Sequence, residues 1–233
     1  MQNSNTVVFA GPVEAARRKE LEQAFGDISM RTRFVSYGET DSVFKDRETP
    51  RFLITLPAPA TCGSFETLDI GALDAHFDIE LHGRFDAAQS CLKAAGEAGC
   101  ALLHIVDADG LIGGQGNSLG ATAAMAALGL SRSIALDHRD KPIRSNALAL
   151  APDWDAEDLA ALSAFLFTGK GGEMSGQVLA LSKNTVHICS QPRPLRVGHR
   201  ENGWRQEEVA ALVSTSWQGA LLAHESASEA FSL

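Results

Sequence analysis

The sequence predicts an α/β fold in which one parallel sheet is covered by helices on both faces. Short apolar segments rich in Val, Ile, Leu and Phe alternate with longer helical segments along the chain. Such alternation is typical of parallel sheets built from strand–helix units. The helical segments are rich in Ala and Gly, small residues that let a helix lie close to a sheet. With 233 residues, the chain is long enough for one domain with a substantial core.

Local signals place the individual elements in chain order. A β-branched strand over residues 6–10 stops at Gly11, and Pro12 suits the first turn of a helix over residues 13–25, because its missing N–H would be unpaired there. The other predicted strands cover residues 32–37, 51–56, 102–106, 143–150, 178–181 and 186–189. The other predicted helices cover residues 73–95 with a bend near Gly83, 118–137, 156–167 and 203–217.

Composition restricts the partners and the compartment. The formal net charge of −9 argues against a nucleic-acid partner, because such binding rests largely on Lys and Arg meeting phosphates. The four cysteines form no Cys-x-x-Cys pair and are expected to be reduced thiols. No signal peptide is recognised, and no apolar run is expected to reach the roughly 20 residues of a membrane span. We therefore expect a cytoplasmic protein that binds neither nucleic acid nor membranes.

A strand, a glycine-spaced loop and a small-residue helix follow one another between residues 102 and 136. The strand is 102–106, the loop is 110–116, and the helix continues into Ser-Arg-Ser-Ile-Ala-Leu at 131–136. Three further segments occur in a matching order, at residues 76–85, 143–146 and 175–179. Together these markers resemble the short-chain dehydrogenases/reductases over roughly residues 70–181. The resemblance implies a Rossmann-like, doubly wound parallel sheet.

The same resemblance implies that the chemistry of that family has been lost. A gapless match places Asp107 at the catalytic serine, Gly120 at the tyrosine, Ala124 at the lysine and Glu80 at the asparagine. Glycine offers no proton, and an alanine methyl can neither shift the pKa of a neighbour nor hold a ribose.

An atypical active site is the alternative, with Asp107, Asp109, His104 or Glu80 as new acids and bases. Carboxylates at strand ends beside a helix start are more often caps or solvated loop residues. His104 lies in an apolar strand, where a hydrogen-bonded core histidine is the commoner case.

The turn after the first strand lacks the features of a dinucleotide-binding loop. Such a loop needs glycines so that the backbone can approach the pyrophosphate and direct a helix N-terminus at it. Only Gly11 is present, and Pro12 and Glu14 follow, the latter with the wrong charge for phosphate. About forty residues separate Gly11 from the strand at 51–56, so the resemblance implies that about one strand–helix unit is missing, with residues 38–50 reduced to a loop. No cofactor is therefore expected.

The best-preserved segments are those through which the family assembles. In relatives the helices that match 73–95 and 119–136 pack against partner subunits. We therefore expect a homo-oligomer, or a hetero-oligomer with an active short-chain dehydrogenase. A bulky charge at Ala123 or Ala127 should split it, unless that position faces the chain's own sheet. Residues 183–233 form a C-terminal extension, expected to pack on the domain formed by residues 1–182 or on a partner.

Three functions remain open at this point. The leading hypothesis is a non-catalytic subunit, or pseudoenzyme, that assembles with itself or with an active short-chain dehydrogenase. The second is a pseudoenzyme that binds a small ligand such as an acyl-CoA. The third is an oxidoreductase with an atypical active site, and only in that case would NAD or NADP be bound.

Overall fold

The computed structural model describes residues 5–45, 51–60, 62–113, 116–168, 170–182, 185–189, 196–197 and 205–220. The chain divides into a large compact unit that includes the residues up to Cys189 and a small unit over residues 190–225. The described part of the small unit is helical, with α8 (Gln206–Leu212), a π turn (Val213–Trp217) and a 3-10 turn (Gln218–Ala220). The helix predicted over 203–217 is thus confirmed from Gln206 onward, and residues 203 and 204 lie outside the described residues.

The large unit is built on a seven-stranded sheet with the order β2-β1-β3-β4-β5-β6-β7. All neighbouring strands are parallel except β7, which pairs antiparallel with β6. The strands are β1 (Thr6–Ala10), β2 (Arg31–Val35), β3 (Phe52–Thr55), β4 (Cys100–Asp107), β5 (Ile143–Leu150), β6 (Val178–Ser182) and β7 (Thr185–Ile188). Dinucleotide-binding sheets commonly have the order 3-2-1-4-5-6. This sheet has one strand fewer on the β2 side, in agreement with the predicted truncation.

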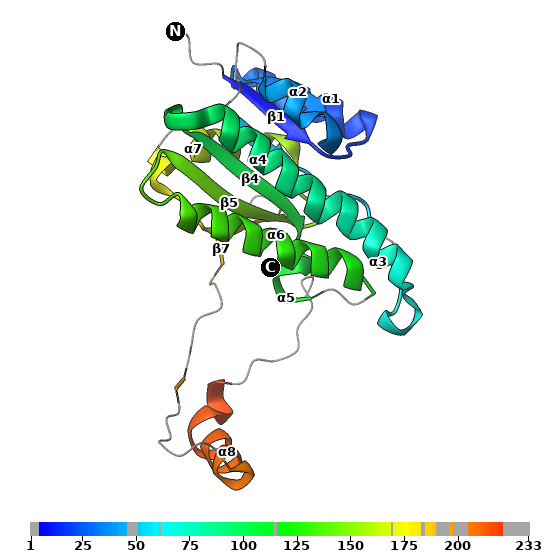
Figure 1. Ribbon diagram of the computed structural model, residues 1–233, viewed down its shortest axis with the longest axis vertical. Helices are drawn as coiled ribbons and strands as arrows, with labels where there is room; N and C mark the ends of the chain where they lie inside the picture. Colours follow the sequence, from blue (N-terminus) through cyan, green and yellow to red (C-terminus); the bar gives the residue numbers. More distant parts are fainter. Residues whose placement is uncertain are drawn as a thin grey trace. The chain divides into compact units, whose positions relative to one another are not determined.

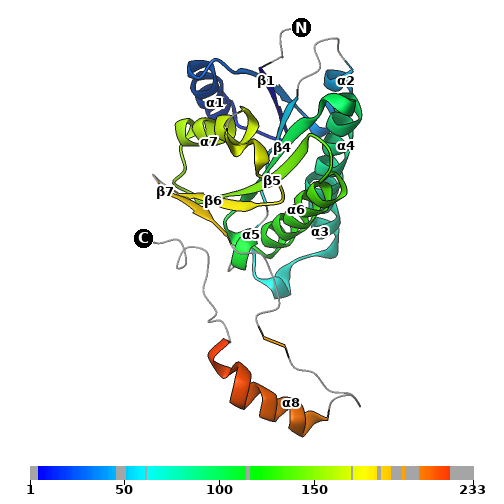
Figure 2. The ribbon, with the colours of Figure 1, turned by 90° about the vertical axis from the view of Figure 1, so that its left-hand side faces the viewer.

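Helices cover both faces of the sheet, which confirms the doubly wound α/β fold (Figures 1 and 2). One layer contains α1 (Ala15–Asp27) and α7 (Ala156–Thr168), and α5 (Asp109–Ile112) follows β4 as a short helix. The other layer contains α2 (Thr40–Phe44), α3 (Ile70–Phe77), α4 (Gly83–Ala95) and α6 (Ser118–Asp137).

Two apolar cores result from the alternation of side chains along the buried strands. In β4, Leu103 and Ile105 join the core under α1 and α7, where Phe9 and Phe25 meet edge to face at 5.1 Å. Leu102 on the opposite face joins the core under α2 and α4.

Four local predictions need correction. Helix α1 begins at Ala15 with Glu14 at its N-cap, so Pro12 lies before the helix and not in its first turn. The predicted loop over 38–50 contains α2, preceded by a 3-10 turn over Tyr37–Glu39; residues 46–50 lie outside the described residues. The bend expected near Gly83 is a π-helical turn over Asp78–His82 that joins α3 to α4. The predicted loop after β4 begins with the short helix α5.

Helix α6 also contradicts the expectation that no segment approaches the length and hydropathy of a membrane span. Ser118–Asp137 reaches a mean hydropathy of 1.4 over an 18-residue window, which makes it long and apolar enough by composition alone. The helix packs against β4 and β5, and the core helix of a soluble protein passes the same test.

Candidate functional site

Open α/β sheets bind ligands outside the carboxyl ends of their strands, at the point where the strand order reverses. In this sheet that point lies at β1, whose neighbours are β2 and β3. Tyr37, which follows β2, closes the inner part of this crevice. Its hydroxyl donates a hydrogen bond of 2.6 Å to the carbonyl oxygen of Leu56, just beyond β3.

The ring of Tyr37 is held between two glycines. A Cβ at Gly83 would lie 2.7 Å from the ring, and one at Gly11 would lie 3.1 Å from it and 2.8 Å from the Leu56 oxygen. Burial raises the pKa of the Tyr37 hydroxyl well above its ordinary value, so the side chain is neutral. Gly11, the one glycine left from the expected loop, therefore makes room for Tyr37.

A buried ion pair lies beside the ring of Tyr37. Glu80 sits in the π turn and Arg84 in the first turn of α4, four residues later, and Arg84 is completely buried. The guanidinium Nε and Nη2 of Arg84 lie 2.9 and 2.8 Å from Glu80 Oε2. The backbone N–H of Ala58 donates to Glu80 Oε1.

The network continues from Arg84 into the sheet. Arg84 Nη1 donates to Thr55 Oγ1 at 2.7 Å, and Thr55 Oγ1 lies 3.0 Å from His104 Nδ1. The Thr55 hydroxyl thus joins Arg84 to His104, and His104 Nε2 is buried without a hydrogen-bond partner among the described residues. Burial and the charge of Arg84 lower the pKa of His104 to about 3. Glu80 and His104 are thereby committed to hydrogen bonds inside the protein.

The positions of the catalytic tyrosine and lysine lie on the buried side of α6. A Cβ at Gly120 would lie 2.5 Å from the side-chain oxygen of Asn117, which caps α6 through the backbone N–H of Gly120. The Ala124 methyl packs against α5, since a Cβ at Gly110 would lie only 2.1 Å from it. Neither position has space for the larger side chain that the family chemistry requires.

Asp107, at the serine position, ends β4 and is half-buried. Burial, and then the charges of Glu80 and Asp109, raise the pKa of its carboxyl. The Asp109 carboxylate accepts a hydrogen bond of 3.1 Å from the Asn117 amide, so it serves as a loop contact. No group of three or more metal-ligating side chains occurs among the residues that the structure describes.

The residues at the crevice do not fit the dinucleotide that the fold implies. Pro12 has no N–H to offer a phosphate, and Glu14 stands at the N-cap of α1 without a side-chain cap bond. Tyr37 and Gly83 are in contact in the inner part of the crevice, so only its outer part is open. We therefore derive no hydride-transfer step for this chain.

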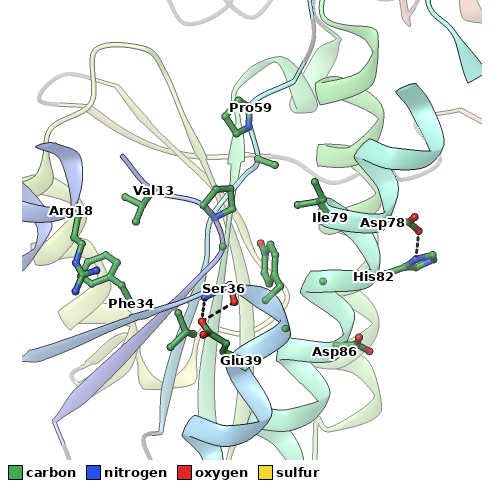
Figure 3. A pocket seen from close by; sticks show the side chains of 17 residues that line it. Val13, Arg18, Phe34, Ser36, Glu39, Pro59, Asp78, Ile79, His82 and Asp86 are labelled. Carbon is green, nitrogen blue, oxygen red and sulfur yellow. Dashed lines mark hydrogen bonds and ion pairs between the residues drawn. The ribbon is translucent and has the colours of Figure 1, made fainter. Parts of the chain in front are cut away.

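An open cleft lies outside Tyr37, with a volume of about 920 Å³. Figure 3 shows Val13 and Phe34 on one side of it and Ile79 on the other. Its polar lining includes Ser36 and Glu39 near β2, and Asp78, His82 and Asp86 on the helix that runs through the π turn into α4.

The sheet order and the crevice at the strand ends define a dinucleotide-binding type of α/β fold. More narrowly, the fold is that of the short-chain dehydrogenases/reductases, with several solved structures of that class matching at probability 1.00. A short chain dehydrogenase from Mycobacterium avium matches with a TM-score of 0.78 at 12% identity, over 96% of this chain and 98% of that one. A putative oxidoreductase from Escherichia coli gives 0.66 at 14% identity, over 76% and 94% of the two chains. An acetoin dehydrogenase from Salmonella typhimurium gives 0.64 at 16% identity, over 76% and 85%.

No family model matches the sequence, and no curated protein matches it significantly. At such low identities the similarity to solved structures establishes the fold alone.

Three site residues have no counterpart in the sequence predictions, namely Tyr37, Thr55 and Arg84. The spacing of Glu80 and Arg84 was a usable signal, because residues four apart on a helix are neighbours. Tyr37 gave no comparable signal, since its partner Leu56 lies 19 residues further along the chain.

Proposed function

We propose that this chain is a non-catalytic subunit with the short-chain dehydrogenase fold, which assembles with itself or with an active relative through the layer of α4 and α6. The catalytic positions support the first half of this proposal. Gly120 and Ala124 carry no acid or base, and Glu80 is held in an ion pair with Arg84. A dinucleotide is not expected to bind, because the crevice that would receive it contains Tyr37.

The outer surface of α6 is the observation that carries the second half. Met125 and Leu136 are 49% and 53% exposed, and the helix has no charged residue from Ser118 to Ser131. A solvent-facing helix ordinarily carries charged and polar residues on its outer face. Gly129 is exposed, and a Cβ there would meet nothing within 4 Å, so packing within the chain does not require a glycine at this place.

The neighbouring helix α4 adds apolar surface to the same layer, with Phe85 46% exposed. By contrast, Ala123 and Ala127 are both buried within the chain, and Ala127 packs in the core with Val106 and Ala149, so neither position is exposed for a contact. The proposed contact is therefore made by the outward residues Met125, Gly129 and Leu136 together with Phe85. An obligate contact of this kind buries on the order of 2,000 Å² or more.

Sedimentation velocity at micromolar concentration tests this proposal. Met125→Glu should shift the wild-type oligomer toward monomer, because a carboxylate would be buried without a partner in the contact. Ile28→Glu is the matched control, since Ile28 is an exposed apolar residue after α1 in the other layer. It should leave the assembly unchanged.

Circular dichroism should give the same spectrum for all three proteins. A wild-type chain that sediments as a monomer, both alone and when co-expressed with an active short-chain dehydrogenase from the same genome, would refute the proposed role.

A further inference from the structure

The cleft outside Tyr37 has room for a ligand. Its volume of about 920 Å³ lies at the upper end of the range of small-molecule sites. It also occupies the place where open α/β sheets bind their ligands, outside the ends of β1 and β2. The assembly proposed above makes no use of it, so a role for the cleft goes beyond that function.

The walls of the cleft are largely apolar. Pro12 and Val13 come from the turn after β1, Pro59 from the segment after β3, and Ile79 from the π turn. Ile79 is 50% exposed although it faces a cleft and not a flat surface (Figure 3). An apolar group of a ligand would remove this surface from water, which is favourable.

Negative charge predominates among the lining residues. Three carboxylates line the cleft, on Glu39, Asp78 and Asp86, against one permanent cation, on Arg18. The charge of Arg18 is already matched, since its Nε lies 2.9 Å from Glu22. Asp78 lies 2.9 Å from the imidazole of His82. Glu39 and Asp86 therefore remain as the unmatched charges.

Glu39 is placed to accept from a ligand. The backbone N–H and the hydroxyl of Ser36 both donate to its Oε2, at 3.1 and 2.8 Å, which leaves Oε1 available. These hydrogen bonds lower the pKa of Glu39, so it is ionised at neutral pH. A cleft lined by one sign of charge raises the local concentration of ions of the opposite sign.

We propose that this cleft binds a small organic cation carried on an apolar body, such as an arylalkylammonium ion. The ammonium group lies toward Glu39, and the apolar body lies against Val13, Pro59 and Ile79, while Asp86 on the opposite wall adds negative potential (Figure 3). An anion of the same shape is disfavoured by these carboxylates, and Pro12 offers no N–H to a phosphate. The proposed ligand is thus a cation, whereas the dinucleotide that the fold implies is an anion.

Three ligands of similar shape and different charge test which charge the cleft prefers, namely phenethylammonium, 2-phenylethanol and phenylacetate. Titrations followed by NMR should show the cation binding about two- to fivefold more tightly than the alcohol, because one exposed carboxylate adds about that much. The anion should bind more weakly than the alcohol. Added salt should weaken binding of the cation and leave that of the alcohol unchanged.

Substitutions then locate the site. Glu39→Gln should weaken binding of phenethylammonium about two- to fivefold, and Asp86→Asn should weaken it less, because Asp86 lies on the opposite wall of the cleft. Asp27→Asn should not weaken it, because Asp27 is an exposed acid at the end of α1 that does not line the cleft. Equal affinity for cation and anion, equal losses in all three variants, or no binding of the cation at millimolar concentration would each overturn the proposal. The oligomeric state is measured separately, so this proposal and the proposed assembly can fail independently.

Discussion

The strand ends and the α4–α6 face of this molecule differ in how completely their side chains are paired. At the strand ends, Glu80 is bonded to Arg84, Thr55 to Arg84 and His104, and Tyr37 to Leu56. On the helical face, Met125 and Leu136 are about half exposed and no charge lies among the residues before Arg132 in α6. Most polar groups at the strand ends are paired inside the chain, although His104 Nε2 is buried without a hydrogen-bond partner among the described residues, and the apolar surface of the helices is left open.

This difference indicates which region depends on a partner. Polar groups poised for catalysis usually retain hydrogen-bonding capacity for a substrate, and perturbed ionisable groups cluster at such sites. Here Tyr37 and His104 Nδ1 have buried partners inside the chain, whereas Asp107, whose pKa burial raises, is half-buried at the end of β4. The strand ends therefore contribute stability, and the helical face is the surface that the proposed assembly would cover.

Breaking the buried ion pair should have the largest effect on stability. Glu80→Gln leaves the buried guanidinium of Arg84 without a countercharge, which should cost about 3–5 kcal/mol of the free energy of unfolding. Glu20→Gln is the matched control, because Glu20 pairs with Arg17 on the exposed surface of α1. The control should cost no more than about 1 kcal/mol. Urea denaturation of both variants measures this, and equal losses would mean that the Glu80 pair is solvated.

Lowering the pH should reduce the free energy of unfolding through the buried His104. The pKa of His104 is about 3 in the folded protein and ordinarily 6.5, so the unfolded chain binds the proton first. The contribution of His104 to stability is complete above pH 6.5 and is lost as the pH falls toward 3, by up to about 1.4 kcal/mol per pH unit.

His104→Leu should remove this slope when unfolding free energies are compared between the two proteins from neutral pH downward. The comparison with wild type is needed because the raised pKa of Asp107 acts in the opposite direction, stabilising the fold as the pH falls. Identical slopes in wild type and variant would contradict the buried, neutral state of His104.

Restoring the family's catalytic residues should have the smallest effect on activity. The triple variant Asp107→Ser, Gly120→Tyr and Ala124→Lys is expected to give no reduction of ketones by NADH or NADPH. Gly120 lies against the cap residue Asn117, Ala124 lies against Gly110, and the cofactor crevice is still closed by Tyr37. Turnover by a folded triple variant would show that the catalytic frame is intact.

The sequence was sufficient for the architecture because strand and helix signals are local. The order of strands and helices and the missing strand beside β2 both agree with the sequence-based prediction. Pro12 was predicted in the first turn of the helix but lies before it, because Glu14 is still extended and α1 begins only at Ala15.

The site was predicted only in part because its contacts join distant segments. The resemblance marked Glu80, Asp107, Gly120 and Ala124 as altered positions, but it did not show what replaced the original chemistry. That depends on Thr55 meeting Arg84, 29 residues away, and His104, 49 residues away. Likewise, only packing distinguishes the buried Ala123 from the exposed Met125 on the same helix.

Calorimetric titration with NAD⁺, NADH, NADP⁺ and NADPH tests the central claim most directly. The crevice contains Tyr37 where a dinucleotide would need space, and Pro12 removes a backbone donor from the turn after β1. We predict no heat beyond that of dilution for any of the four at millimolar concentration. A micromolar dissociation constant for any of them would contradict the claim that this chain has kept the fold and lost the cofactor site.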